Sequence, residues 1–468
     1  MRQKINPQPE LDLYRSNLKV TNEYYEKYEA ISRILDQNPK ILDLVHKDLK
    51  QALKSCTTQD SSGSRYQYTS DTALRILICQ IVEGCSLREI IIRIDDSNFL
   101  RQFVRIYGGP MMDFTTLCKL KNGLSPETWK KINHALAQHA VEQALIDGDK
   151  VRLDTSAVET NIHWPTDSSL LWDDYRVLAR LITAARELDA EVVGNGRLQT
   201  RKAKKLAVKI ARKGSQQPQA REALKPLYSR LIELVTGIGA WAQSVRAALL
   251  ERKSRYGILE QASAERLASE LAHYRDLGLR VIDQATRRVL RGESVPNEEK
   301  LFSIFEPHTE LLKRGKAAKP IEFGHMIQIQ QVGGKFITDY DVFEKKPVEY
   351  ELLEEALASH HKLFGHPPDT LAADKGYYQD MSALDRLEKK VELVAIAKKG
   401  SLTPEQKERE SDPDFRFAQR FRAGVEGTIS FLKRVLGLFR CLNRGWEHYV
   451  STIGAAIFTH NLLILARC

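Results

Sequence analysis

Three acidic residues, far apart in the chain, have the types and settings of ligands for a divalent cation. Asp154 stands in the middle of VRLDTSAV, which suits a short half-buried strand, and Asp374 ends the apolar part of DTLAADKGYY. Glu426 lies in the helical pattern RFRAGVEGTISFLKR. Carboxylate oxygens without neighbouring His or Cys residues favour Mg²⁺ or Mn²⁺. Two such ions, about 4 Å apart, can activate an attacking oxygen and stabilise the leaving oxygen in a phosphoryl transfer.

Each acid also has a simpler interpretation. Asp154 could be a satisfied core residue or cap a local turn, and Asp374 could begin a turn at the end of its strand. Glu426 could form an exposed ion pair with Arg422, four residues earlier, which stabilises a helix by roughly a few tenths of a kcal/mol. Spacing alone leaves these alternatives open.

The segment around Glu426 favours the ligand interpretation. At 100° per residue, Arg422, Glu426 and Lys433 fall on one narrow face of a helix. Gly424 and Gly427 weaken the helix beside Glu426 and would permit a close approach of backbone or ligand. We therefore expect two strand ends and one helix to bring the three acids to one edge of a sheet.

The elements that must position these acids follow from the hydrophobic period. GHMIQIQQV and KFITDYDVF alternate on either side of Gly333 and Gly334, which predicts a hairpin. Helices are expected over 348–364 and 381–390, a buried strand over 391–399, and a long helical stretch from Arg416. This order predicts an α/β protein with one mixed sheet, flanked by helices and interrupted by an all-helical segment.

The sequence before Asp154 is helical. Between Thr69 and Leu145, short helical patterns joined by turns resemble a helix-turn-helix module, with 86–94 as the supporting helix and 113–121 as the recognition helix. A plain helical bundle would have the same pattern. The predicted domains are a helical arm and linker (1–65), a helical DNA-binding domain (66–148), a catalytic domain (149–175 and 300–468) and a helical insertion (176–299).

The charge of the chain favours an anionic partner. The 468 residues carry a net charge of +10, with 42% hydrophobic and 28% charged residues, as in a soluble globular protein. Nucleic acid is the first candidate and a membrane surface the second. The segment 197–213 holds eight Lys or Arg and no acid, so it is either a solvated helix face or a surface for DNA phosphates. The predicted DNA contacts within it are Arg201, Lys202, Lys204, Lys205 and Lys209.

The cysteines and the chain ends predict a cytoplasmic protein. Six widely spaced cysteines form no CxxC pair, which favours reduced thiols. The first residues lack the apolar segment of a secretory signal. The most apolar terminal stretch, 453–465, is too short for a membrane span and is expected to be a packed helix.

Five segments together resemble the DDE transposases of bacterial insertion sequences, in particular ISNCY-like proteins. They are LRILICQIVEGCSLREI, VRLDTSAVETNIHWPTDSSLLWDD, EFGHMIQIQQVGGKFITDYDVF, LAADKGYY and RAGVEGTISFLKR, and the resemblance runs from about Thr69 to the C-terminus. It implies a ribonuclease-H-like core in which Asp154, Asp374 and Glu426 are the catalytic acids and hold two Mg²⁺ ions, for which Mn²⁺ can substitute.

The resemblance also implies partners and an activity. Such a protein binds the terminal inverted repeats of its element, cuts the DNA and joins the freed 3′ hydroxyl to target DNA, as at least a dimer in the nucleoid. Arg422, Lys433 and, beside the second acid, Lys375 would contact DNA phosphates. Many related enzymes carry a Tyr, Arg, Glu, Lys signature on the last helix; in this chain Gln419 replaces the Tyr.

Two other functions share these features. One is a DNA-binding regulator, or domesticated remnant, that keeps the catalytic core only as a scaffold. The other is a ribonuclease-H-like nuclease that cuts DNA without joining it. The presence of all three acids favours activity.

Overall fold

The computed structural model describes residues 4–5, 17–54, 68–213, 218–313 and 320–467. The chain divides into two compact units, one formed by Met1–Thr160 with Gly324–Cys468 and the other by Asn161–Phe323. Helices make up 64% of the structure and the sheet is open and mixed, so the α/β class expected from the sequence is confirmed.

The sheet follows the order β2-β3-β1-β5-β6, while β4 pairs with β3 and β7 pairs with β1, which makes seven strands in the described part of the chain. β1 is antiparallel to β3 and parallel to β5, and β5 is parallel to β6. The strands are β1 (Lys150–Thr160), β2 (Glu310–Lys313), β3 (Ile321–Gln331), β4 (Ile337–Val342), β5 (Thr370–Ala373), β6 (Leu393–Ile396) and β7 (Arg440–Cys441).

The hairpin expected around Gly333 and Gly334 is confirmed, because β3 and β4 pair antiparallel on either side of η4 (Gly333–Lys335). Gly334 has a φ of 64°, a left-handed conformation that glycine adopts without steric cost. The short strands β2 and β7 were not expected from the sequence.

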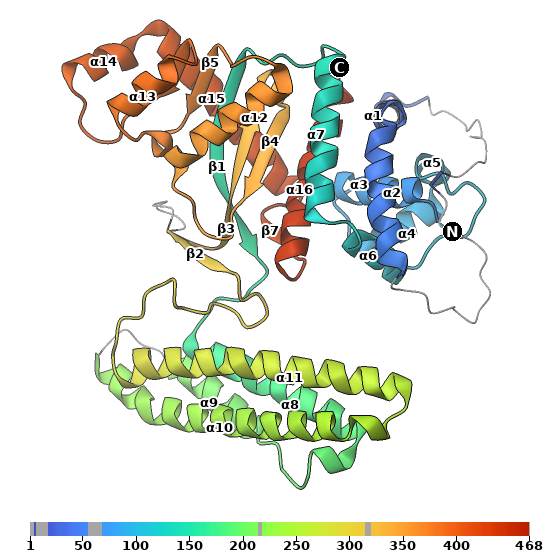
Figure 1. Ribbon diagram of the computed structural model, residues 1–468, viewed down its shortest axis with the longest axis vertical. Helices are drawn as coiled ribbons and strands as arrows, with labels where there is room; N and C mark the ends of the chain where they lie inside the picture. The colour runs from blue at the N-terminus through green and yellow to red at the C-terminus, as the bar shows by residue number, and fades with distance from the viewer. Residues whose placement is uncertain (1–3, 6–16, 55–67, 214–217, 314–319, 468) are drawn as a thin grey trace. The chain divides into compact units, whose positions relative to one another are not determined.

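Helices cover both faces of the parallel half of the sheet (Figure 1). On one face, Phe415 and Ala418 of α15 pack on Ala372 and Ala395. On the other, a second apolar cluster contains residues of β1, β5 and β6 with residues of α12 and α13. The elements of this part are η5 (Glu349–Leu352), α12 (Leu353–Phe364), η6 (Lys375–Tyr377), α13 (Met381–Glu388), α14 (Pro404–Ser411) and α15 (Pro413–Arg434).

The N-terminal helices share one hydrophobic core with α16 (Trp446–Leu465) and with residues of β3 and β4. They therefore belong to the same compact unit as the sheet. In the predicted helix-turn-helix region, α4 and α6 begin after the capping residues Ser86 and Asp113, and α5 lies between them. The helices are α1 (Lys19–Gln37), α2 (Pro39–Lys54), α3 (Ser70–Val82), α4 (Leu87–Asp96), α5 (Asn98–Phe103), α6 (Phe114–Asn122) and α7 (Pro126–Glu142).

The C-terminal helix α16 is the one helix of the described chain that is long and apolar enough to cross a membrane, yet 78% of its most apolar window is buried. Asn461 on this helix donates to the carbonyl of Ile337 and accepts from its N–H, at 2.8 and 3.0 Å. Such satisfied polar contacts belong to a packed interior. α16 is therefore a core helix, as expected.

The second unit is a helical bundle in which α8, α10 and α11 pack on one another and α9 packs on α8 and α10 (Figure 1). It comprises residues 161–323, a wider range than the expected 176–299, because α8 continues without a break from Asp167 and its apolar face joins the bundle core. Its helices are α8 (Asp167–Leu188), η1 (Ala190–Val192), α9 (Thr200–Lys213), α10 (Pro218–Glu251), η2 (Lys253–Arg255), α11 (Ile258–Ala285) and η3 (Thr286–Leu290).

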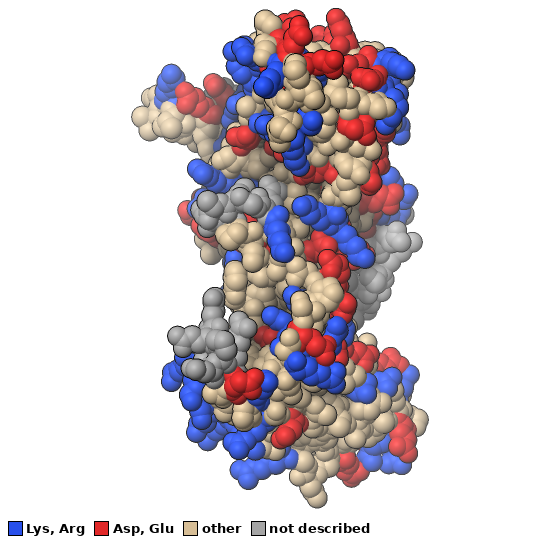
Figure 2. Space-filling model, turned by 90° about the vertical axis from the view of Figure 1, so that its left-hand side faces the viewer, with Lys and Arg blue, Asp and Glu red and all other residues tan. Residues whose placement is uncertain are grey.

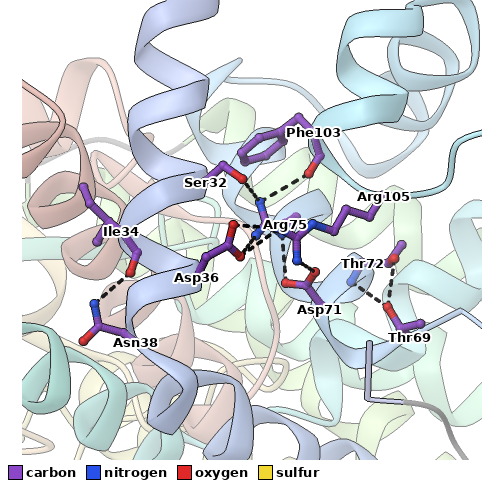
Figure 3. Close-up of polar contacts among 10 residues, drawn as sticks. All are labelled: Ser32, Ile34, Asp36, Asn38, Thr69, Asp71, Thr72, Arg75, Phe103 and Arg105. Atoms are coloured by element: carbon purple, nitrogen blue, oxygen red, sulfur yellow. Dashed lines mark hydrogen bonds and ion pairs between the residues drawn. The ribbon is translucent and has the colours of Figure 1, made fainter. Parts of the chain in front are cut away.

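A buried ionic network joins three of the N-terminal helices (Figure 3). The fully buried Arg75 of α3 donates to Asp71 of the same helix and to Asp36 and Ser32 of α1, each at 2.8 Å. It also donates to the carbonyl of Phe103 at the end of α5, at 3.4 Å. Arg105 donates to Asp71 at 3.0 Å and to Asp36 at 2.8 Å, so removal of Arg75 would leave the buried Asp71 with one cationic partner in place of two.

We predict that Arg75→Met lowers the free energy of unfolding by about 3–5 kcal/mol, because Asp71 would remain buried with less compensation. Arg93→Met is the matched control: Arg93, with 45% of its side chain exposed, pairs with Glu89 one turn earlier and with Glu83, and because solvent screens these pairs its loss should cost much less than the loss of Arg75. Urea denaturation measures both values. Equal values for the two variants would contradict a structural role for the network.

Candidate active site

The first two acids lie on neighbouring parallel strands. β1 and β5 pair with Leu153 opposite Ala373, so the next residues along the two strands, Asp154 and Asp374, are side by side where β5 ends. Neighbouring strands are about 4.8 Å apart. Both carboxylates are half-buried. The structure thus brings together the two aspartates that the sequence predicted at one sheet edge.

Local hydrogen bonds orient these two carboxylates. Asp154 Oδ1 accepts the N–H of Thr155 at 2.8 Å. Asp374 Oδ1 accepts the N–H of Gly376 at 2.6 Å and caps the short helix η6. The turn-capping contacts considered for each aspartate therefore exist, and they coexist with the pairing of the two acids.

The third acid is carried by α15, which Arg152 anchors to the sheet. Arg152 of β1 donates through Nε to Gln331 Oε1 of β3 at 2.8 Å and through Nη1 to the carbonyl of Phe421 on α15 at 2.5 Å. Its guanidinium also lies 4.6 Å from the centre of the Phe421 ring. Burial lowers the pKa of Arg152 to about 10, so the group stays charged at neutral pH.

The two glycines beside Glu426 have different roles. A Cβ on Gly424 would collide with Nη1 of Arg152, so this glycine lets the guanidinium reach the helix backbone. A Cβ on Gly427 would meet nothing within 4 Å. The close approach expected here is real for Gly424, and the group that approaches is a side chain of the same protein.

Gln419 and Arg422 precede Glu426 on α15. Gln419 Nε2 donates to the carbonyls of Ala373 and Ala395, at 3.2 and 2.6 Å, and so ties the helix to the ends of β5 and β6. Arg422 is 19% exposed, and its buried Nε has no hydrogen-bond partner in the described structure. Gln419 therefore has a positioning contact of its own.

The carboxylate of Glu426 does not join the two aspartates in a ligand set. Its side chain is 69% exposed and its carboxylate lies 3.4 Å from Nη2 of Arg422, which is the ion pair of the simpler interpretation. Within the described residues, no three His, Cys, Asp or Glu side chains are arranged to hold a metal ion. Two acids converge, and the third lies on the packed helix with its carboxylate turned to solvent.

A fourth acid, which sequence reasoning missed, lies at this edge. Glu349 of η5 accepts a hydrogen bond from Thr155 Oγ1 at 2.6 Å. A Cβ on Gly376 would collide with the Glu349 carboxylate and would lie 2.8 Å from Asp374 Oδ1. Glu349 is one of several glutamates in PVEYELLEE, and only the glycine of DKGYY hints at its approach.

Tyr377 shows how closely these acids gather. Its side chain is buried and its hydroxyl accepts a hydrogen bond from Gln328 Nε2 at 3.2 Å. Burial raises the pKa of Tyr377 well above its usual value, and the carboxylates of Asp154, Glu349 and Asp374 raise it further. The edge of the sheet is therefore a site of concentrated negative potential, which favours a cation.

The basic residues predicted to bind DNA are distributed over both units. Lys375 is exposed directly after Asp374, and Lys433 is partly buried near the end of α15. Five others belong to α9, where Ala203 and Ile210 are buried and the charged residues are exposed. They are Arg201, Lys202, Lys204, Lys205 and Lys209.

The five cations of α9 form no ion pair within the described part of the chain. Lys202 donates to the side-chain amide oxygen of Gln199 at 3.4 Å. Figure 2 shows Lys and Arg side chains gathered along an edge of the helical unit. Such a surface binds polyanions.

Comparison of the chain with protein-family models, with curated proteins and with solved structures found no match.

We predict that Gly424→Ala lowers the free energy of unfolding by about 1–3 kcal/mol, because Arg152 or α15 must shift to admit the methyl group. Gly427→Ala is the matched control on the same helix and should raise it by about 0.5–1 kcal/mol through helix propensity. Thermal and urea denaturation of both variants measure the difference. Stabilisation by both substitutions would contradict the described contact between Arg152 and α15.

Proposed function

We propose that the protein is a DNA transposase that binds the ends of its element and catalyses metal-dependent strand cleavage and strand transfer, on a ribonuclease-H-like core. The pairing of Asp154 with Asp374 carries this proposal, because it places two hard oxygen donors side by side on neighbouring strands. The sequence resemblance and the basic surfaces support it.

The donor set fits Mg²⁺ or Mn²⁺ by its chemistry. Asp154 and Asp374 would hold the metal, and Glu426 would complete the set by turning its exposed side chain, which gives up only a long ion pair with Arg422. Bound metal would supply activation of the attacking oxygen and stabilisation of the leaving oxygen, through two ions. Glu349 would add negative charge beside Asp374 and hold Thr155, next to Asp154, in place.

The remaining groups would position the DNA. Arg422 has a donor without a partner in the described structure, and Lys375 is exposed beside Asp374, so both are suited to a phosphate near the scissile bond. Lys433 would contact the strand farther along α15. No protein side chain need act as the nucleophile, because water and then a DNA 3′ hydroxyl can serve. At least a dimer would be needed to join two element ends, in the bacterial nucleoid.

We predict that Asp374→Asn abolishes Mg²⁺-dependent cleavage and joining of a labelled duplex carrying the element's own end, with duplex binding retained. Asp385→Asn, an exposed acid on α13, is the matched control and should leave all three activities unchanged. Gel separation of cleaved and joined products measures the chemistry, and a mobility shift measures binding.

The same experiment separates the other functions. Unchanged cleavage in Asp374→Asn would refute the site assignment. Binding without cleavage in the wild type would identify a regulator or domesticated remnant, and cleavage without joining would identify a nuclease.

We predict that changing Lys204, Lys205 and Lys209 together to Gln weakens duplex binding equally for all sequences and reduces the slope of log affinity against log salt by about 2.7. The buried residues of α9 are untouched, so the fold should persist. A control with Arg255, Arg266 and Arg280 changed to Gln removes three exposed charges from a helix region that also carries acids. Equal slopes for the two variants would exclude α9 as the DNA surface.

A further inference from the structure

A pocket of about 520 Å³ lies within the first unit, and none of the proposed catalytic acids lines it. Its wall is formed by the turn between α3 and α4, the end of α6, Trp129 of α7, the segment that follows α15, and α16. This volume is in the usual range for small-molecule sites. Residues of the predicted helix-turn-helix region and residues at the end of α15, the helix that carries Glu426, therefore line the same pocket.

The charge of the pocket wall has one sign. Lys121, Arg434 and Arg440 line it, beside His448, and its described wall contains no Asp or Glu. Nη2 of Arg440 forms an ion pair at 2.9 Å with Glu159, which does not line the pocket. The pocket therefore offers uncompensated positive charge to an anion.

Lys121 is the half-buried cation of this wall, whereas Arg434 and Arg440 are exposed. Its Nζ donates to the amide oxygen of Asn443 at 3.3 Å, and it forms no ion pair in the described part of the chain. Burial lowers the pKa of Lys121, and the neighbouring Cys441 and Cys118 offset only part of this shift. Burying an unpaired ammonium is costly unless an anion joins it.

Other features of the wall suit the rest of the ligand. Apolar residues provide a surface for a flat apolar group: Leu77, Ile81, Leu87, Trp129, Leu436 and Leu442. Asn122 adds an amide whose only described contact is the Cys118 sulfur, at 3.8 Å. The N-terminus of α4, at Ser86 and Leu87, adds a partial positive charge.

We propose that this pocket binds a nucleotide, with Lys121 and Arg434 holding the phosphate and the apolar wall holding the base. A fatty acid would also bring an anion and an apolar body, but it offers no polar edge to the exposed amide of Asn122. Arg434 lies eight residues after Glu426 on α15, about 12 Å along the helix axis, which a DNA strand of a few nucleotides can span. The nucleotide can come from such a strand or be free in solution.

The test is equilibrium binding to the full chain in EDTA, so that its outcome does not depend on cleavage. The probes are adenosine 5′-monophosphate, adenosine, inorganic phosphate and the tetranucleotide (dT)₄. We expect saturable binding of the monophosphate, tighter than that of adenosine or phosphate. Lys121→Met should weaken it at least tenfold, whereas Lys119→Met, an exposed lysine on the same helix, should change it less than twofold.

Two further measurements guard against a folding artefact. Lys121→Met should melt at or above the wild-type temperature, because it removes a desolvated charge, whereas a lysine with a structural role would lower the melting temperature. Leu442→Asp places a carboxylate on a side chain that is 72% exposed at the pocket, and it should weaken binding without affecting the fold.

Each outcome bears on the proposal. Tighter binding of (dT)₄ than of the monophosphate, lost in Lys121→Met, would assign the pocket to a DNA strand, and the reverse order would assign it to a free nucleotide. Equal binding of phosphate and monophosphate would overturn the role of the base. Absence of saturable binding by the monophosphate and (dT)₄ would overturn the proposal, and binding of a polyglutamate peptide in their place would assign the pocket to an acidic protein segment.

Discussion

The candidate active site depends on one buried cation, Arg152, whose described hydrogen bonds all go to neutral groups. It joins β1 to β3 through Gln331 and to α15 through the carbonyl of Phe421. Arginine suits this position because its planar group donates in several directions and keeps its charge when burial lowers its pKa. Without this contact the helix that carries Glu426 would lose a main link to the strand that carries Asp154.

The parallel pairing of β1 with β5 imposes a second constraint. Register places Asp154 beside Asp374, and the approach of Glu349 to Gly376 adds a third carboxylate to the same edge. Thr155 and Gly376 donate hydrogen bonds to these carboxylates and hold them at this edge. Carboxylates gathered in this way offer hard oxygen donors to a cation.

The basic residues are of two kinds: some have acidic partners, and others form no ion pair in the described structure. Arg75 in the N-terminal helices is fully compensated by acids, so its charge serves the fold. The exposed cations of α9 and the half-buried Lys121 form no ion pair in the described structure. Charges that the protein does not neutralise itself indicate where an anionic partner would bind.

Local sequence patterns were sufficient to predict the α/β class, the hairpin at Gly333 and Gly334, and the position of the two aspartates at one sheet edge. These features depend on period, on turn residues and on strand ends, which neighbouring residues encode. Glu349 could not be found this way, because its partner Thr155 is 194 residues earlier in the chain. For the same reason, local sequence could not predict the contact of Gly424 with Arg152 or the exposure of the Glu426 carboxylate. Tertiary structure alone decided these contacts, since long-range packing leaves little trace in the local pattern of either segment.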